Sequence, residues 1–343
     1  MMGGRGSHSG IRSGGGGFPV MTGRRSPAGL VGGGGAGGAG GGSPPVPASS
    51  PDARDRIHDP NTQQGTGAPG GPNAPVRPAG AVPASLENFE TYQRDWERRY
   101  FQGFSAADRQ YLKEQFQKVF ESNGFYMNIN SRYLENVADE HFKNQFETGG
   151  NSGGAEFDAS DMTPSNGRVD AAVQLFGLDY TKMRREDYEK YGSMQTLDLA
   201  TAASRSPSGY GDALVRFKKE NVWERTTYTI GDSLGPASMS DLVAGKVSSG
   251  QFTGIDINDS RYLLQRVKQA ESLVTDAQRW DDVIEGDWGS YLEVQYHGAL
   301  TMNDVECIVF TRPNNIPNAR VLNKLRSFGV KLYKYEGGRI RAL

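Results

Sequence analysis

Short runs of alternating apolar and polar residues occupy the second half of the chain, and such alternation is typical of half-buried β-strands. The expected strands cover residues 213–218 (ALVRFK), 225–230 (RTTYTI), 291–296 (YLEVQY), 306–310 (ECIVF) and 330–335 (VKLYKY). In YLEVQY, side chains two residues apart share a face, so Tyr291, Glu293 and Gln295 point the same way. This face is either the solvated side of an ordinary sheet or part of a functional site.

Helical spacing dominates residues 85–146. Aromatic residues recur there at intervals of three and four, at Phe89, Tyr92, Trp96 and Tyr100. Ser105 and Asp108 have the spacing of a capping box and open a second helix, which is expected to end at Gly124. A third helix is expected to carry a stripe of Leu134, Val137, His141 and Phe142. We interpret residues 85–150 as a helical block whose stripes pack in a core.

A short helix is expected before the strands, at residues 168–178, and two further helical segments interrupt them, at residues 259–280 and 318–329. They do not alternate with the strands in a regular β-α-β repeat. This order favours an α+β fold over a doubly wound parallel sheet.

The N-terminal segment differs from the rest of the chain in composition. Much of the glycine and proline of the 343-residue sequence falls in residues 1–84, in runs such as VGGGGAGGAGGGSPPVPASSP. Such a segment has too little apolar surface to offset the entropy cost of ordering its backbone, so it is expected to be a disordered tail. A loop rich in glycine and asparagine, at residues 147–167, is expected to separate the helical block from a third region, residues 151–343.

Charge and residue usage exclude several classes of protein. The net charge is −2 and the isoelectric point about 6.2, which argues against a protein that coats nucleic acid. Cys307 is the single cysteine, so an internal disulfide and a cysteine-based zinc cluster are excluded. The four histidines are scattered, and no metal site is expected. The sequence has neither a membrane-length apolar stretch nor the pattern of a signal peptide.

Three segments, read in order, point to a family. They are KYGSMQTLDL (190–199), GYGDALVRFKKENVWERTTYTIGDSL (209–234) and YLEVQYHGALTMNDVECIVF (291–310). Together they resemble the ADP-ribosyltransferase-like domain found at the end of certain phage minor head (head morphogenesis) proteins and in related bacterial proteins. The resemblance covers about half of the chain, from Arg168 to Leu343.

The resemblance implies a split β-sandwich, with two small sheets around a cleft that binds NAD as a substrate. Carried over by position, Arg216 would contact a phosphate or ribose of NAD, and the segment from Thr229 to Ser233 would shape the cleft. Glu293 would be the catalytic acid. Gln295 occupies the place where relatives commonly hold a second acid, and could instead orient the ribose or the acceptor. Tyr291 would be an aromatic or hydroxyl partner of Glu293.

These residue types suit the reaction that the resemblance implies. Cleavage between nicotinamide and ribose leaves positive charge on the sugar, which a carboxylate such as that of Glu293 can stabilise. The pyrophosphate of NAD prefers a forked cation, which Arg216 could provide.

The sequence therefore leads to one main hypothesis of function and two alternatives. The main hypothesis is a mono-ADP-ribosyltransferase that modifies a macromolecular acceptor, protein rather than nucleic acid, and that is phage-associated or a bacterial effector. The first alternative is a structural protein of the phage head or portal with a non-catalytic transferase-like domain, which would contact capsid or portal proteins. The second is NAD hydrolysis at the same site. The expected location is the virion or the host or bacterial cytoplasm, without membrane contact.

Overall fold

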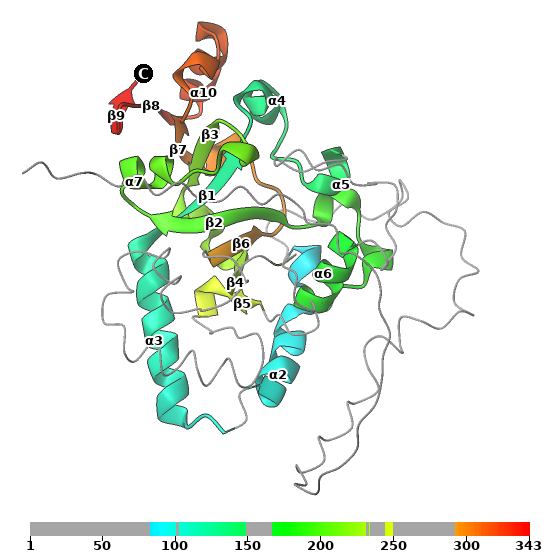
Figure 1. The fold of residues 1–343 in the computed structure, drawn as a ribbon. Helices are drawn as coiled ribbons and strands as arrows, with labels where there is room; N and C mark the ends of the chain where they lie inside the picture. Colours follow the sequence, from blue (N-terminus) through cyan, green and yellow to red (C-terminus); the bar gives the residue numbers. More distant parts are fainter. Residues whose placement is uncertain (1–82, 101–102, 149–166, 231–232, 234–243, 250–291) are drawn as a thin grey trace, which may run out of the picture. The chain divides into compact units, whose positions relative to one another are not determined.

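The computed structural model describes residues 83–343 except 101–102, 149–166, 231–232, 234–243 and 250–291 (Figure 1). The expected tail, apart from its last two residues, lies outside this part of the chain. So do the expected helix at 259–280, most of the expected boundary loop and Tyr291.

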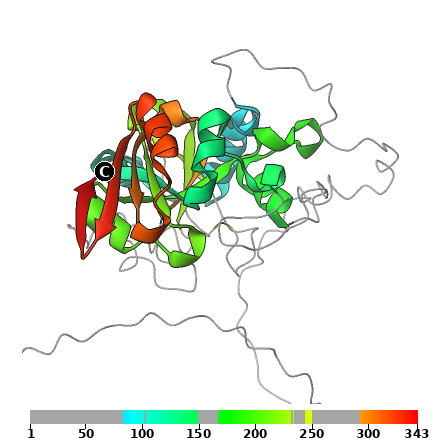
Figure 2. The same ribbon diagram turned by 90° about the horizontal axis from the view of Figure 1, so that it is seen from above.

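The described strands form one sheet of nine, in the order β5-β4-β6-β2-β1-β3-β7-β8-β9. All neighbouring strands are antiparallel except β7 and β8, which run parallel. The strands β8 and β9, orange to red in Figure 2, form one edge. Their bounds are β1 Asn123–Ile129, β2 Lys190–Thr196, β3 Ala213–Phe217, β4 Thr226–Ile230, β5 Gly245–Lys246, β6 Leu292–Tyr296, β7 Val305–Phe310, β8 Lys331–Glu336 and β9 Arg339–Ala342.

Helices and this mixed sheet confirm the α+β fold class. Each of the five strands expected from alternation is present, as β3, β4, β6, β7 and β8. The described strands belong to one continuous sheet, whereas the resemblance implies two small ones.

One expectation for the helical block is wrong, because the block contains a strand. The helix that begins after Ser105 ends at Ser122, and β1 follows at once and pairs with both β2 and β3. Asn123 stops the helix, since its side-chain Nδ2 donates to the carbonyl of Val119 while its backbone is extended. The sequence after it, NGFYMNI, alternates as a strand does: Phe125 and Met127 face the main core and Tyr126 faces the opposite side.

The described α-helices flank the sheet. They are α2 Phe89–Tyr100, α3 Ala106–Ser122, α4 Leu134–Asp139, α5 Gln145–Thr148, α6 Gly167–Phe176, α7 Leu199–Ser204, α8 Lys219–Val222 and α10 Ala319–Ser327. The capping expected for α3 is present, because the Ser105 hydroxyl accepts from the backbone N–H of Asp108 at 3.0 Å. The third expected helix is shorter than its stripe, since α4 ends before His141. No helix of the described ranges is long and apolar enough to cross a membrane.

The main core lies on one face of the sheet, beneath α3, α4 and α10. Its aromatic centre joins Phe116 and Phe120 of α3 to Tyr228 of β4, with ring centroids 5.5 and 4.7 Å from that of Tyr228. On the opposite face of β6, Phe176 of α6 packs edge-on against His297, with 4.8 Å between centroids. The side chains on this face of β6 therefore lie between the sheet and α6.

Candidate functional site

The strand register places polar residues of β2, β6 and β4 side by side on the face opposite the main core. Glu293 of β6 is directly opposite Ser193 of β2 and Thr229 of β4. Gln295 is directly opposite Tyr191 and Thr227. Directly opposite residues share a face, so these six side chains form one polar patch. Glu293 is only 4% exposed, and Gln295, Thr227 and Thr229 are fully buried.

Gln295 connects the members of this patch. Its Nε2 donates to a carboxylate oxygen of Glu293 at 2.9 Å and to the hydroxyl of Thr229 at 3.1 Å. Its Oε1 accepts from the hydroxyl of Thr227 at 2.9 Å. The carboxamide therefore fixes the orientation of the Glu293 carboxylate, a task that a second carboxylate could not perform because it has no hydrogen to donate.

His297 extends the network toward the N-terminal part of the chain. Its Nε2 lies 2.8 Å from the Thr227 hydroxyl, and its Nδ1 lies 2.7 Å from the hydroxyl of Ser85. Because Thr227 donates to Gln295, we assign the ring proton to Nε2 and the acceptor role to Nδ1. Burial, reinforced by the positive charges of Lys190, Arg225 and Lys246, lowers the pKa of His297 to about 3. A neutral histidine therefore orients the polar patch.

An arginine from α6 lies at the edge of the patch. The guanidinium of Arg168 stacks over the ring of Tyr191 at 4.1 Å from the centroid. Its Nη1 lies 3.5 Å from the hydroxyl of Ser233, and its Nε donates to Gln145 at 3.1 Å. Burial opposes the charge of Arg168, but neighbouring groups, Tyr191 and Glu293 foremost, raise its pKa overall. Arg168 thus places a permanent cation at the edge of the patch, close to the Glu293 carboxylate.

A second carboxylate, Glu189, lies at the start of β2. One of its oxygens accepts from the Tyr191 hydroxyl at 2.5 Å. Its side chain is 2% exposed, and burial raises its pKa despite that hydrogen bond and the nearby charges of Arg168 and Lys190. Its other oxygen and the side-chain Oε1 of Gln195, both buried, have no hydrogen-bond partner among the residues that the structure describes. A group that donates hydrogen bonds would satisfy these two buried acceptors.

The residues predicted from the sequence to form the site do not all lie together in the structure. Glu293, Gln295 and Thr229 share the network described above, and Ser233, fully buried, is connected to it through Arg168. Tyr291 lies outside the described residues. Arg216 lies on β3, with β1 and β2 between it and β6.

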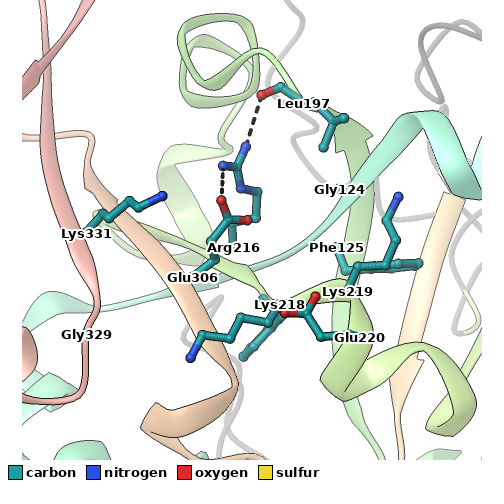
Figure 3. A pocket seen from close by; sticks show the side chains of 11 residues that line it. Gly124, Phe125, Leu197, Arg216, Lys218, Lys219, Glu220, Glu306, Gly329 and Lys331 are labelled. Atoms are coloured by element: carbon teal, nitrogen blue, oxygen red, sulfur yellow. Dashed lines mark hydrogen bonds and ion pairs between the residues drawn. The ribbon is translucent and has the colours of Figure 1, made fainter.

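Arg216 has partners of its own at the end of its strand. Its Nη2 forms an ion pair with Glu306 at 2.7 Å, and its Nη1 donates to the carbonyl of Leu197 at 3.0 Å (Figure 3). The two residues border a pocket of about 420 Å³, to which Glu293 does not contribute. The expected convergence of Arg216 with Ser233 and Glu293 is therefore not seen among the described contacts.

Sequence reasoning missed Tyr191, Ser193 and Thr227 of the polar patch, and also its neighbours Arg168 and Glu189. For Arg168 no signal was available, because one arginine at the start of a helix resembles any other. Glu189 and Tyr191 precede Ser193 at intervals of two, which is the period of a strand face, and this pattern in EKYGS could have revealed them. In the described residues, no group of three or more histidine, cysteine, aspartate or glutamate side chains is arranged to hold a metal ion.

Comparison with known proteins adds a phage relative. No protein-family model matches the chain. The Gene 2 protein of Mycobacterium phage L5 is 28% identical to it over 117 residues, which make up 33% of this chain and 42% of the phage protein. The chain is therefore similar to less than half of the length of this relative, whose name indicates no activity.

Proposed function

We propose that the protein is an NAD-dependent mono-ADP-ribosyltransferase that modifies a macromolecular acceptor in a phage-associated or bacterial setting. The observation that carries the proposal is the position of Glu293. Its carboxylate is held by the Gln295 carboxamide, opposite Thr229, on the sheet face that carries Tyr191, and Arg168 of α6 stacks over the ring of Tyr191. The sequence resemblance gives the reaction, and the phage relative is compatible with the setting.

The polar patch has the groups that transfer of ADP-ribose requires. A carboxylate fixed in orientation stabilises the positive charge that develops on the ribose as nicotinamide leaves, without reorganising during the reaction. The Glu293 carboxylate can also accept a hydrogen bond from a ribose hydroxyl. Glu293 is thus proposed as the catalytic residue and Gln295 as the residue that positions it.

The cation of the site is proposed to be Arg168. A guanidinium binds phosphate oxygens through parallel N–H groups, and Arg168 is the arginine that lies next to Ser233 and Tyr191. The sequence-based choice, Arg216, is ion-paired elsewhere. We therefore assign the pyrophosphate of NAD to Arg168.

The experiment that tests this proposal incubates the full-length protein with host lysate and NAD labelled in the adenylate phosphate. Label incorporated into macromolecules and nicotinamide released are both measured. Glu293→Gln is the key variant, because glutamine can still accept the hydrogen bond from Gln295 while losing the charge. We expect it to lower turnover by roughly 100-fold or more. Glu224→Gln, at an exposed position, makes the same chemical change and should retain wild-type turnover.

The outcomes separate the three hypotheses of function. Labelled macromolecules with a Glu293-dependent rate support transfer, whereas nicotinamide release without labelling identifies NAD hydrolysis. A wild type that is no faster than Glu293→Gln in either measurement contradicts the enzyme proposal.

A structural role in a phage particle is the second candidate, and the burial of Glu293 favours it. A side chain that is 4% exposed, with its carboxylate already hydrogen-bonded, is also what a non-catalytic domain would use to specify its core. This candidate predicts that Glu293→Gln changes stability without affecting any NAD chemistry. It also predicts that the protein sediments with capsid or portal proteins.

A further inference from the structure

The pocket around Arg216 is a second polar site, separate from the patch around Glu293. It has a volume of about 420 Å³ and lies at the margin of the sheet where β1, β7 and β8 begin and β3 ends. Four cationic side chains border it against two carboxylates, so the lining has a net positive charge: Arg216, Lys218, Lys219 and Lys331 against Glu220 and Glu306. We propose that this pocket binds the phosphate group of a small phosphorylated molecule.

Arg216 and Lys331 are the residues positioned to grip such a group. In Figure 3, the ammonium of Lys331 points toward the Arg216–Glu306 pair. Lys331 is exposed and has no ion-pair or hydrogen-bond partner among the described side chains. Arg216 uses one N–H of each terminal nitrogen for Leu197 and Glu306 and also interacts with the Tyr126 hydroxyl, so these partners do not use all five of its N–H groups. A phosphate between the two cations would accept from both.

The other two lysines contribute charge more than contacts. Lys218 donates to the carbonyl of Asn303 at 2.9 Å. Lys219 donates to the carbonyls of Phe120 and Glu121 at 2.9 and 2.6 Å. These carbonyls hold the ammonium groups in place without neutralising them, so both add to the positive potential at the pocket.

The size and charge of the pocket favour a small ligand over a nucleic acid. Its volume is in the range of sites for small molecules. Glu220 and Glu306 on its border would repel a chain of phosphates, and the protein as a whole is slightly acidic. Gly329 leaves part of the border open, because a side chain added there would meet no atom within 4 Å.

The pocket is also distinct from the site proposed for NAD. Arg216, Tyr126, Ser193 and Glu293 are successive partners across β3, β1, β2 and β6. The backbones of Arg216 and Glu293 are therefore three strand spacings, roughly 14 Å, apart. Tyr126 lies between them fully buried, with its hydroxyl donating to the carbonyl of Thr196 at 2.8 Å.

Calorimetric titration of the full-length protein with inorganic pyrophosphate, at constant ionic strength, tests the proposal. We expect a pyrophosphate site that Lys331→Gln weakens about tenfold and Lys331→Glu weakens more, because a hydrogen bond to a charged group is lost. Both substitutions are at an exposed position and should leave the fold intact. The matched control is Lys113→Gln on α3, which is exposed and distant from the pocket lining and should bind as wild type does.

A variant with the opposite effect makes the test sharper. Glu306→Gln removes the carboxylate that competes with the ligand for Arg216, so it should tighten pyrophosphate binding severalfold. Absence of binding by wild type, or equal affinity in the Lys331 and Glu306 variants, overturns the proposal.

Two further binding measurements, with an oligonucleotide and with NAD, identify which kind of phosphate-containing molecule the pocket binds. A short single-stranded oligonucleotide that binds more tightly than pyrophosphate, and equally depends on Lys331, would contradict a small-molecule site. Binding of NAD that competes with pyrophosphate and is weakened by Lys331→Gln would make the pocket part of the NAD site and contradict the separation of the two sites. Glu293→Gln should leave pyrophosphate affinity unchanged, so failure of the transferase proposal and failure of this one are distinguishable.

Discussion

Arg216 and Glu293 lie in one row of residues across the sheet and on the same face, yet two strands separate their own strands and they do not contact each other. Each is instead fixed by a local partner, Arg216 by the Glu306 carboxylate and Glu293 by the Gln295 carboxamide. The cation adjacent to Glu293 comes from α6. This arrangement divides the polar face into two places where charge is concentrated.

Arg168→Gln should impair NAD turnover through substrate binding. The substitution removes the guanidinium that lies beside Ser233 and over Tyr191, so we expect KM for NAD to rise about tenfold or more with a smaller change in kcat. Steady-state kinetics of nicotinamide release is the measurement. Arg339→Gln on β9, at an exposed position, is the matched control and should leave KM unchanged. An equal effect of both variants would contradict a role for Arg168 in the site.

Gln295→Glu should destabilise the protein rather than complete a pair of catalytic acids. Glutamate cannot donate to Glu293 and Thr229 as the Gln295 Nε2 does, and it would add a second buried carboxylate next to the first. We expect a loss of about 3 kcal/mol in the free energy of unfolding at pH 8. The loss should be smaller at pH 5, where one proton can be shared between the two carboxyl groups. Urea unfolding at both pH values measures it, and a loss that does not depend on pH would contradict this explanation.

His297 should make the stability of the protein fall as the pH decreases from about 6.5 toward 3. Its pKa is about 3 in the folded protein against 6.5 for the free side chain, so below pH 6.5 the unfolded chain binds a proton that the folded chain does not. Between pH 7 and pH 5 this linkage should cost about 2 kcal/mol.

The comparison that isolates this effect is wild type against His297→Gln, each unfolded in urea at pH 7 and pH 5. The titration of all other groups is shared by both proteins, so the difference between their pH dependences belongs to His297. The variant should be less stable at pH 7, because the contact with Ser85 is altered, but should lose less on acidification. Parallel pH dependences of the two proteins would contradict a neutral buried His297.

Gly192→Ala should destabilise the sheet by about 3 kcal/mol or more. A Cβ at this position would lie 2.1 Å from the backbone oxygen of Tyr126 and 2.8 Å from the ring of Tyr296. The glycine allows the Tyr296 ring to cross β2 and donate its hydroxyl to that same oxygen at 3.1 Å. Thermal unfolding measures the effect. Gly209→Ala, where no atom lies within 4 Å, is the control and should change the melting temperature little.

The strands that alternation predicted are those with one apolar and one polar face. In β6, Leu292 and Val294 pack in the main core while Glu293 and Gln295 lie on the other face, as the alternation in the sequence predicts. The structure differs from an ordinary half-exposed sheet because the polar face of β6 is buried as well. Every residue of β6 is buried, so both faces of the strand are covered, and alternation alone cannot distinguish a covered polar face from an exposed one.

The sequence did not predict strand β1, because this strand follows a helix without an intervening loop. Helical spacing continues through Phe116 and Phe120 and predicts that the helix ends at Gly124, which is already part of β1. The chain becomes extended at Asn123 because β1 is inserted between β2 and β3, strands that come more than sixty residues later in the sequence. Such long-range pairing supplies backbone hydrogen bonds that no local pattern encodes.

The sequence by itself determined the α+β class, five strands, the helix at α10 and the pairing of Glu293 with Gln295 on one face of β6, because these follow from side-chain periodicity within a single element. Only the tertiary structure decided which cation accompanies Glu293. The order of strands in the sheet, set by hydrogen bonds between distant segments, places Arg216 three strands away, and the packing of α6 against β2 and β6 brings Arg168 to the site instead.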